Sequence, residues 1–272
     1  MHARLAFRVL VLSAFVVSIG VSAYAQGAQT QAKPFEPSVG QAGKDVVWVP
    51  TPQELVDKML DLAKVTPQDF LMDLGSGDGR TVITAAKRGL RAQGIEYNPD
   101  MVDLAKRNAA TAGVGDRASF MKADLFETDF SKAQVITLFL LPSINMRLRP
   151  TILNMKPGTR IVSNTFTMED WQSDQDETIT GDCTSWCTAH LWIVPAKVEG
   201  TWQVAQGPLT LTQSFQMVTG TLGSTAIAGG RLRGDEISFS VGNAKYTGRV
   251  EGNSIKGTIT GGSGGAWTAT RR

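Results

Sequence analysis

The stretch Leu71–Gly79 constrains the fold of this chain more than any other. An apolar run ends in the acid Asp73, three alternating glycines follow, and a helical pattern begins at Arg80. Glycine allows backbone conformations that other residues avoid, and it lets the main chain approach a ligand closely. A strand, a glycine turn and a helix in this order predict the entry to a nucleotide-type site. A generic glycine-rich turn of an α/β protein is the alternative for this stretch taken alone.

The residues around the glycines narrow the choice of ligand. The dinucleotide fingerprint needs a glycine where this chain has Arg80, which argues against a helix start that cradles a pyrophosphate. The carboxylate of Asp73 would repel a pyrophosphate but would attract an ammonium group. The methionine end of S-adenosylmethionine carries such an ammonium, so the loop favours that cofactor.

Two further acids end the next two expected strands. Glu96 closes the run Gln93–Glu96, about 20 residues past the loop, where a carboxylate can accept hydrogen bonds from a ribose diol. Asp124 follows the next run and would accept from the adenine amino group, with Leu125 against the ring. The alternatives are a surface acid for Glu96 and a helix or turn cap for Asp124. With Asp73, these acids predict a pocket for S-adenosylmethionine.

Residues from about Val49 to Val194 resemble the seven-strand (class I) methyltransferases, and more closely the ATP synthase c-subunit lysine methyltransferases and their bacterial relatives. The matching stretches are Val49-Pro50-Thr51-Pro52, Asp73-Leu74-Gly75-Ser76-Gly77-Asp78-Gly79-Arg80, Ala85-Ala86-Lys87-Arg88-Gly89 and Gly94-Ile95-Glu96-Tyr97-Asn98-Pro99. The resemblance implies that Asp73, Gly75 and Gly77 contact the methionine moiety, and it implies a protein lysine as the methyl acceptor. The expected cofactor-binding residues are Thr51, Asp73, Gly75, Ser76, Gly77, Glu96, Tyr97, Asp124 and Leu125.

The acceptor site is expected at the carboxyl ends of the strands. There, Asn145 or Asn164 could orient the nucleophile and Asp170 could attract a cationic lysine. The structural alternatives are a helix cap for Asn145 and a solvated loop acid for Asp170. We find no metal-ligand spacing in the sequence, and no Ser-His-Asp arrangement that would support hydrolysis.

Five expected strands alternate with helical patterns between residues 46 and 195. This alternation predicts an α/β domain with a Rossmann-like, doubly wound seven-strand sheet and helices on both faces. The five runs are Phe70–Leu74, Gln93–Glu96, Ser119–Lys122, Val135–Leu141 and Arg160–Asn164.

The pattern changes after Pro195, and residues 198–272 form short alternating runs spaced by glycine. Such runs predict a small all-β domain, a barrel or a sandwich. Gly200-Thr201-Trp202 and the late Arg271 are similar to the G-x-W and closing Arg of lipocalin-like barrels. We favour a packing or dimerisation module over a ligand-holding barrel.

The first 25 residues are typical of a signal peptide. Arg4 and Arg8 precede the apolar core Val9–Val21, and Ala23-Tyr24-Ala25 gives a cleavage site after Ala25. Residues 26–45 are polar and are expected to form a flexible leader. These features predict a periplasmic or secreted protein with no stable membrane span after cleavage; an uncleaved anchor is the alternative.

Cys183 and Cys187 are separated by three residues. We expect Asp176–Cys183 and Cys187–Val194 to pair as an antiparallel hairpin, which brings the two thiols close enough for a disulfide. The alternative is two free thiols in a reduced compartment. An exported protein favours the disulfide.

The charges are balanced, with 27 basic and 25 acidic residues, and no basic stripe with interleaved aromatics supports nucleic-acid binding. The sequence, with the resemblance, therefore predicts an S-adenosylmethionine-dependent methyltransferase that acts on a protein lysine. The alternative is an exported, non-enzymatic binding protein that keeps the fold and recognises a partner through its C-terminal β-domain.

Overall fold

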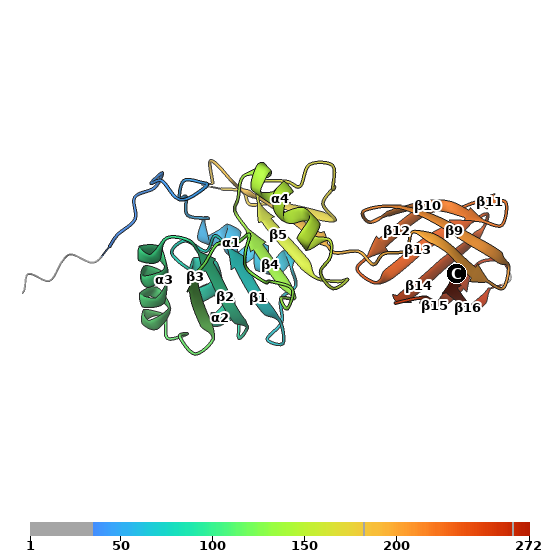
Figure 1. Cartoon of the computed structure of the whole chain (residues 1–272), viewed down its shortest axis with the longest axis horizontal. Helices are drawn as coiled ribbons and strands as arrows, with labels where there is room; N and C mark the ends of the chain where they lie inside the picture. The colour runs from blue at the N-terminus through green and yellow to red at the C-terminus, as the bar shows by residue number, and fades with distance from the viewer. Residues whose placement is uncertain (1–34, 182, 263) are drawn as a thin grey trace, which may run out of the picture. The chain divides into compact units, whose positions relative to one another are not determined.

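A computed structural model describes residues 35–181, 183–262 and 264–272 (Figure 1). The expected signal peptide and the first part of the expected leader lie outside the described residues. None of the helices in the described part is both long and apolar enough to cross a membrane.

The first sheet has the strand order β3-β2-β1-β4-β5-β7-β6. Its first five strands are parallel, and β7 runs antiparallel to both β5 and β6. This arrangement confirms the predicted seven-strand methyltransferase sheet. The strands are β1 Phe70–Leu74, β2 Arg91–Glu96, β3 Ala118–Lys122, β4 Val135–Leu138, β5 Arg160–Asn164, β6 Gln175–Thr178 and β7 Thr188–Ile193.

Four helices cover the two faces of this sheet (Figure 1). The helices are α1 Gln53–Leu62, α2 Arg80–Lys87, α3 Pro99–Thr111 and α4 Pro142–Ile152. The buried residues of α1, α2 and α3 share one apolar cluster with Leu71 and Val135. Those of α4 join Met72 and Ile136 in a second cluster. Successive strand residues point to opposite faces, so both faces are apolar, as a doubly wound sheet requires.

The run Val135–Leu141 was expected to be one long strand, but β4 ends at Leu138. Phe139 and Leu140 leave the ladder and line a cavity at the carboxyl edge of the sheet. Both side chains are apolar because they line that cavity, so the apolar run in the sequence is longer than the strand.

The second sheet closes on itself and forms an antiparallel barrel of eight strands, with the short β11 outside the ring. The prediction of a small barrel or sandwich is therefore confirmed in its barrel form. The strands are β8 Gly200–Val204, β9 Gly207–Ser214, β10 Met217–Leu222, β11 Thr225–Ala226, β12 Ala228–Arg233, β13 Glu236–Val241, β14 Ala244–Glu251, β15 Ser254–Thr260 and β16 Gly265–Arg271.

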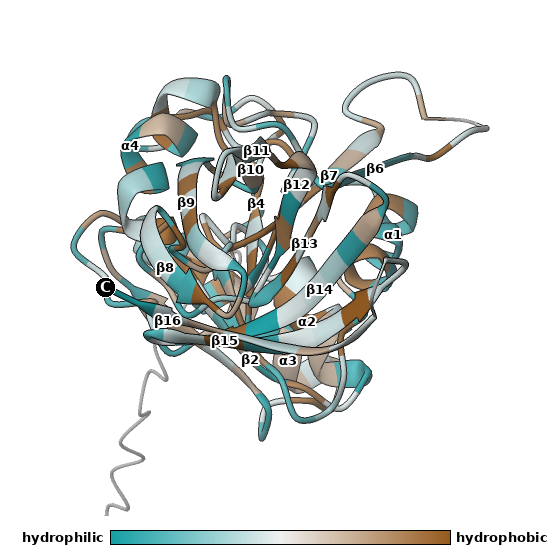
Figure 2. Cartoon of the chain, turned by 90° about the vertical axis from the view of Figure 1, so that its right-hand side faces the viewer, coloured by the Kyte–Doolittle hydropathy of each residue, from teal (hydrophilic) through white to brown (hydrophobic). Residues whose placement is uncertain are grey.

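Aromatic side chains pack inside this barrel. The rings of Phe239 and Tyr246 stack with centroids 4.9 Å apart, and Trp267 meets both edge-on. Hydrophobic and hydrophilic residues alternate along β13 and β14 (Figure 2). At the closure, the Arg271 guanidinium lies 4.6 Å from the Trp202 ring centre and donates to the Glu199 carbonyl. These contacts fit a packed module.

The disulfide between Cys183 and Cys187 is formed, with a Cα–Cα distance of 5.9 Å, as predicted. The hairpin around it differs from the expected one. The β6–β7 ladder ends at the Thr178–Thr188 pair, so the disulfide lies in the connecting loop and closes that loop beyond the ladder.

Candidate functional site

The glycine loop between β1 and α2 forms the floor of a cavity. Gly75, Gly77 and Gly79 have φ values of +82°, +52° and +84°, which only glycine adopts readily. The Gly75 and Ser76 amides both donate to the Ile95 carbonyl, and this ties the loop to β2. A Cβ at Gly75 would come within 3.1 Å of a methyl group of Leu140. The loop is therefore bare main chain at the points where a ligand would approach.

Asp73 ends β1 below this loop and is almost completely buried. Thr137 donates a hydrogen bond of 2.6 Å to its carboxylate. Burial, with smaller contributions from the nearby acids Glu96 and Asp78, raises the pKa of Asp73 to about 7. Asp78 pairs with Arg80, but among the described residues no cation pairs with Asp73 itself. A cationic group of a ligand would fill this role, and the ammonium of S-adenosylmethionine fits it.

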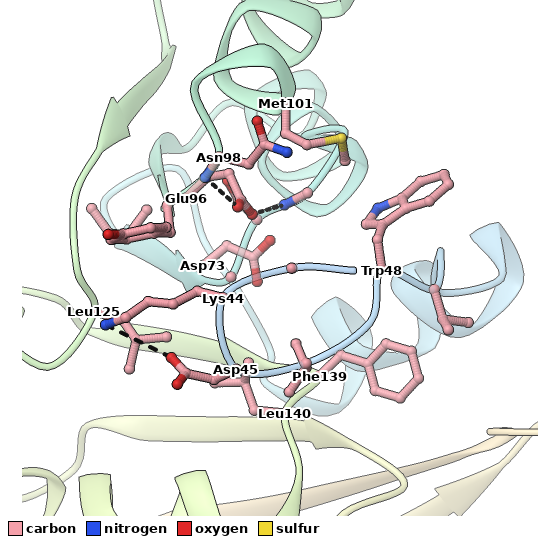
Figure 3. A pocket seen from close by; sticks show the side chains of 18 of the residues that line it. Lys44, Asp45, Trp48, Asp73, Glu96, Asn98, Met101, Leu125, Phe139 and Leu140 are labelled. Carbon is pink, nitrogen blue, oxygen red and sulfur yellow. Dashed lines mark hydrogen bonds and ion pairs between the residues drawn. The ribbon is translucent and has the colours of Figure 1, made fainter. Parts of the chain in front are cut away.

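Glu96 ends β2 and lies next to the loop (Figure 3). Its two carboxylate oxygens accept hydrogen bonds of 2.9 Å, one from the Gly77 amide and one from the Asn98 amide. A carboxylate oxygen can accept more than one hydrogen bond, so Glu96, which lines the cavity, can also accept from a ribose hydroxyl. Glu96 thus fixes the shape of the glycine loop as well as offering an acceptor to a ligand. The neighbouring Tyr97 lines the same cavity.

Asp124 follows β3, and Leu125 beside it lines the cavity with it. One Asp124 oxygen accepts from the Phe126 amide, which makes the turn cap considered as an alternative above. The other pairs with Lys44. The hydrogen bond from Lys44 lowers the pKa of Asp124 and raises that of Lys44. The expected adenine acceptor therefore already has a cationic neighbour.

Residues 41–49 cover the cavity from the other side, and the sequence reasoning missed them. Ala42 pairs with Val47 in a β-bridge, and the Gly40 amide donates to the Trp48 carbonyl. The Lys44 ammonium lies 4.9 Å from the centre of the Tyr97 ring. The first five of these residues belong to the expected flexible leader. The apolar run Val46–Val49 just before Pro50 was the signal that this segment packs against the domain.

Arg80, the residue that excluded the dinucleotide fingerprint, connects two parts of the cavity wall. Its guanidinium pairs with Asp78 at 2.6 Å and donates to the Thr51 carbonyl at 2.8 Å. Thr51 is buried beside the cavity and accepts a side-chain hydrogen bond from Asn164 at 3.2 Å. Arg80 therefore holds the segment before α1 against the glycine loop.

The three candidate acceptor residues lie outside the cavity lining. Asn145 is completely buried inside α4 and donates to the Thr167 carbonyl. Asn164 is completely buried at the end of β5 and contacts Thr51. Asp170 is exposed and pairs with Arg149, which lowers the pKa of Asp170. Their roles in catalysis stay predictions, and their contacts support the segments that carry the site.

Ser76 Oγ is buried and has no hydrogen-bond partner among the described residues. It packs against β2, where a Cβ at Gly94 would come within 2.4 Å of it. No group of three or more His, Cys, Asp or Glu side chains in the described part of the chain is arranged to hold a metal ion. The donors, acids and glycine cradle together suit a sulfonium nucleoside with an amino-acid tail.

Comparison with known proteins agrees with this geometry. A family model described as the ANTKMT methyltransferase domain matches residues 73–175. A protein-lysine N-methyltransferase of Saccharolobus islandicus is 45% identical over 129 residues, which are 46% of this chain and 80% of that protein. An adenine nucleotide translocase lysine N-methyltransferase of Mus musculus is 36% identical over 119 residues, covering 43% of this chain and 52% of that protein.

A solved structure gives the same result for the fold and the cofactor. An RNA methyltransferase from Salinibacter ruber, in complex with S-adenosyl-L-homocysteine, is 47% identical with a TM-score of 0.52, and the match covers 55% of this chain and 96% of that one. The resemblance noted in the sequence is confirmed, and S-adenosylmethionine is the cofactor. The alternative of a non-enzymatic binding protein is not favoured. The chain belongs to the protein-lysine N-methyltransferase family of S-adenosylmethionine-dependent methyltransferases.

Proposed function

We propose that this enzyme transfers a methyl group from S-adenosylmethionine to the side-chain amine of a lysine in a protein. The observation that carries the proposal is the 45% identity to a protein-lysine N-methyltransferase over four fifths of that protein's length. The family model matches residues 73–175, which contain the glycine loop and the acids Asp73, Glu96 and Asp124 of the cavity lining.

Different residues of the cavity would bind different parts of the cofactor. The Asp73 carboxylate would hold the ammonium of the cofactor, Glu96 the ribose hydroxyls, and Asp124 with Leu125 the adenine. When bound, the cofactor supplies a methyl group already activated by the sulfonium. The protein must hold a neutral amine in line with that methyl at near-attack distance and exclude water. Burial of the acceptor lysine lowers its pKa and supplies the neutral form.

Methyl transfer from isotopically labelled cofactor tests this proposal. The purified chain is incubated with labelled S-adenosylmethionine and a protein extract of the source cells, and methylated lysines are identified by mass spectrometry. Label on lysine is expected with the wild-type chain and not with Asp73→Asn, which keeps the side-chain volume but removes the charge. The proposal fails if the wild-type chain binds S-adenosylhomocysteine and labels no lysine.

RNA is the second candidate acceptor, because the structurally matched Salinibacter protein is described as an RNA methyltransferase. The balanced charge of this chain gives RNA no electrostatic advantage. The labelling experiment is therefore repeated with total RNA from the same cells. Label that survives protease treatment but not ribonuclease treatment would assign RNA as the acceptor.

We propose that the chain is exported, with cleavage after Ala25, and acts in the periplasm or outside the cell. The proposal rests on Arg4 and Arg8 before an apolar core, and on the cysteine pair, because disulfides persist in oxidising compartments. Cell fractionation with mass spectrometry of the mature N-terminus tests it. A chain that keeps residues 1–25 in the cytosolic fraction would contradict it.

A further inference from the structure

A second hollow adjoins the cofactor cavity, and we call it the side groove. It is lined by residues 42–47, Val49, Phe139, Leu141, Phe166 and Trp186. Residues 42–47, Val49 and Phe139 also line the cofactor cavity, so the two spaces are continuous. Figure 3 shows Phe139 beside the loop that carries Lys44 and Asp45, at this junction.

The side groove exposes apolar surface that a protein normally buries. Val47, Leu141 and Trp186 are among the most exposed large hydrophobic residues described, with relative exposures of 55%, 42% and 41%. Contiguous exposed apolar surface beside a cavity marks a binding site more often than isolated exposed residues do. The grouping of these three side chains around one groove therefore requires an occupant.

Three aromatic rings form a continuous wall of this groove. The Phe139 and Phe166 rings stack with centroids 5.9 Å apart, and Trp186 meets Phe139 edge-on at 6.0 Å. Aromatic faces suit the aliphatic stem of a lysine and a methylated ammonium at its end. Asp45 lines the same groove 3.8 Å from the Lys44 ammonium, and its half-exposed carboxylate can also attract a cationic side chain.

Backbone in the left-handed region positions two of these rings. Trp186 has φ +57°, and Thr165, just before Phe166, has φ +58°. Non-glycine residues with such values persist only where their surroundings hold them in place. Thr165 is held by its amide, which donates to the Thr188 carbonyl at 2.7 Å, and by His190 Nε2, 3.1 Å from the Thr165 carbonyl.

Trp186 is held through its neighbour Cys187, whose sulfur is bonded to Cys183 and whose carbonyl accepts from the Ile179 amide. The disulfide closes a loop that has no ladder pairing of its own. It therefore restricts the conformations available to the residue next to it.

From these contacts we infer that the side groove is the acceptor site for a lysine side chain, and that the Cys183–Cys187 disulfide positions Trp186 as one of its walls. The inference rests on the proposed function and adds the place and the determinants of acceptor binding. Trp186 is a specificity-determining residue, and the disulfide acts through it. Loss of the disulfide is expected to weaken acceptor binding without weakening cofactor binding.

A pair of cofactor analogues tests the groove without knowledge of the acceptor. In both, nitrogen replaces the sulfur of S-adenosylhomocysteine. The parent carries a methyl group on that nitrogen, and the extended form carries an n-butyl group of the length of a lysine stem. Calorimetry measures both affinities. The butyl group is expected to tighten binding about tenfold, because it buries apolar surface in the groove.

The variants assign the effect to named residues. Trp186→Ala is expected to remove most of the gain and to leave the affinity of the parent within about twofold. Trp186→Phe keeps a ring and should keep most of the gain. Met217→Ala removes an exposed apolar side chain on the barrel and should keep all of it. The double variant Cys183→Ser/Cys187→Ser should behave like Trp186→Ala.

Each outcome has one meaning. If the parent analogue does not bind the wild-type chain, the cofactor site fails and the proposed function fails with it. If the parent binds and the butyl group adds nothing, the groove is not the acceptor site, while the proposed function stands. If the gain survives in the double serine variant, the disulfide does not position Trp186.

Discussion

Asp73 is a carboxylate that its surroundings make difficult to ionise. It is buried near the end of β1 with Glu96 and Asp78 nearby, and the Thr137 hydroxyl is its only hydrogen-bond donor in the described part of the chain. Its raised pKa of about 7 means that it is largely protonated in the free protein at pH 6. A bound ammonium needs the ionised form, so cofactor binding and proton release from Asp73 are linked.

The affinity for S-adenosylhomocysteine is therefore expected to rise about tenfold from pH 6 to pH 8 and then to level off, since the carboxylate must be ionised first. Calorimetry at several pH values measures this. Adenosine lacks the amino-acid tail and is the control, with an affinity that should change little over the same range. A flat profile for both ligands would contradict the assignment of Asp73 to the ammonium.

The same residue should make the free protein less stable as pH rises. The unfolded carboxylate loses its proton near pH 4, but the folded one keeps it to about pH 7, so stability falls as pH rises between these values and then stops falling. Asp73→Asn removes this loss. We expect it to raise the free energy of unfolding at pH 8 by on the order of 2 kcal/mol, and by much less at pH 5. Urea unfolding at both pH values checks the prediction.

At the scale of single elements, the glycine loop depends on space as well as on backbone freedom. Gly77 has φ +52°, and a Cβ there would lie 2.7 Å from the indole nitrogen of Trp48. Gly113, which follows α3, has φ +70° and open space around it. Both positions therefore need a residue that tolerates a positive φ, but only at Gly77 would an added Cβ collide with a neighbouring side chain.

Gly77→Ala is expected to abolish cofactor binding, because it displaces Trp48 and the segment that covers the cavity. Gly113→Ala should bind normally and lose only about 1 kcal/mol of stability from the backbone strain. Circular dichroism establishes that both variants fold, and calorimetry measures binding. Normal binding by a folded Gly77→Ala would show that the covering segment is not part of the site.

The sequence predicted the bounds of a strand well where one hydrophobic pattern continued over the whole strand. The bounds of β1 and β5 match the structure, because each is a short buried strand between clear breaks. The run Leu209–Val218 contains none of the Gly, Pro, Asn or Asp residues typical of turns, yet a turn at Phe215 and Gln216 divides it between β9 and β10. Phe215 turns the chain with φ +53°, and no Gly, Pro or Asn marks that turn.

The cofactor acids were predictable because each follows an apolar run at the same sheet edge. The acceptor region was not, since Phe139, Phe166 and Trp186 meet only through the fold. Phe166 reaches the groove through the unusual backbone of Thr165, and Trp186 through a disulfide loop. Lys44 and Trp48 were missed because a polar leader composition masked an apolar run that packs over the cavity.

At the scale of the whole molecule, the barrel carries a core of its own. Its buried cluster runs from Ala196 to Ala269 and contains both Trp202 and Trp267. A closed sheet leaves its ring strands paired on both sides, which removes the open edges at which a sheet pairs with other chains. These features predict that the barrel folds independently.

Residues 196–272 expressed alone are therefore expected to give a cooperative thermal transition with a β-type circular dichroism spectrum. Trp267→Ala should lower the free energy of unfolding of the fragment by about 3–5 kcal/mol, because core packing is lost. The thermal transition should then shift to a much lower temperature or disappear. Lys256→Ala, on an exposed side chain, is the matched control and should melt as the parent fragment does. A fragment without a transition would show that the barrel needs the rest of the chain.

The ends of the barrel meet, since Arg271 of β16 lies opposite Trp202 of β8. Its first and last strands can therefore be joined by a short linker and new termini opened in any exposed turn, such as the one at Gly252, without cutting the ring. A module with adjoining ends can be added to or removed from an unrelated chain by a single insertion or deletion of coding sequence. This gives a simple genetic route by which a methyltransferase domain could acquire such a barrel.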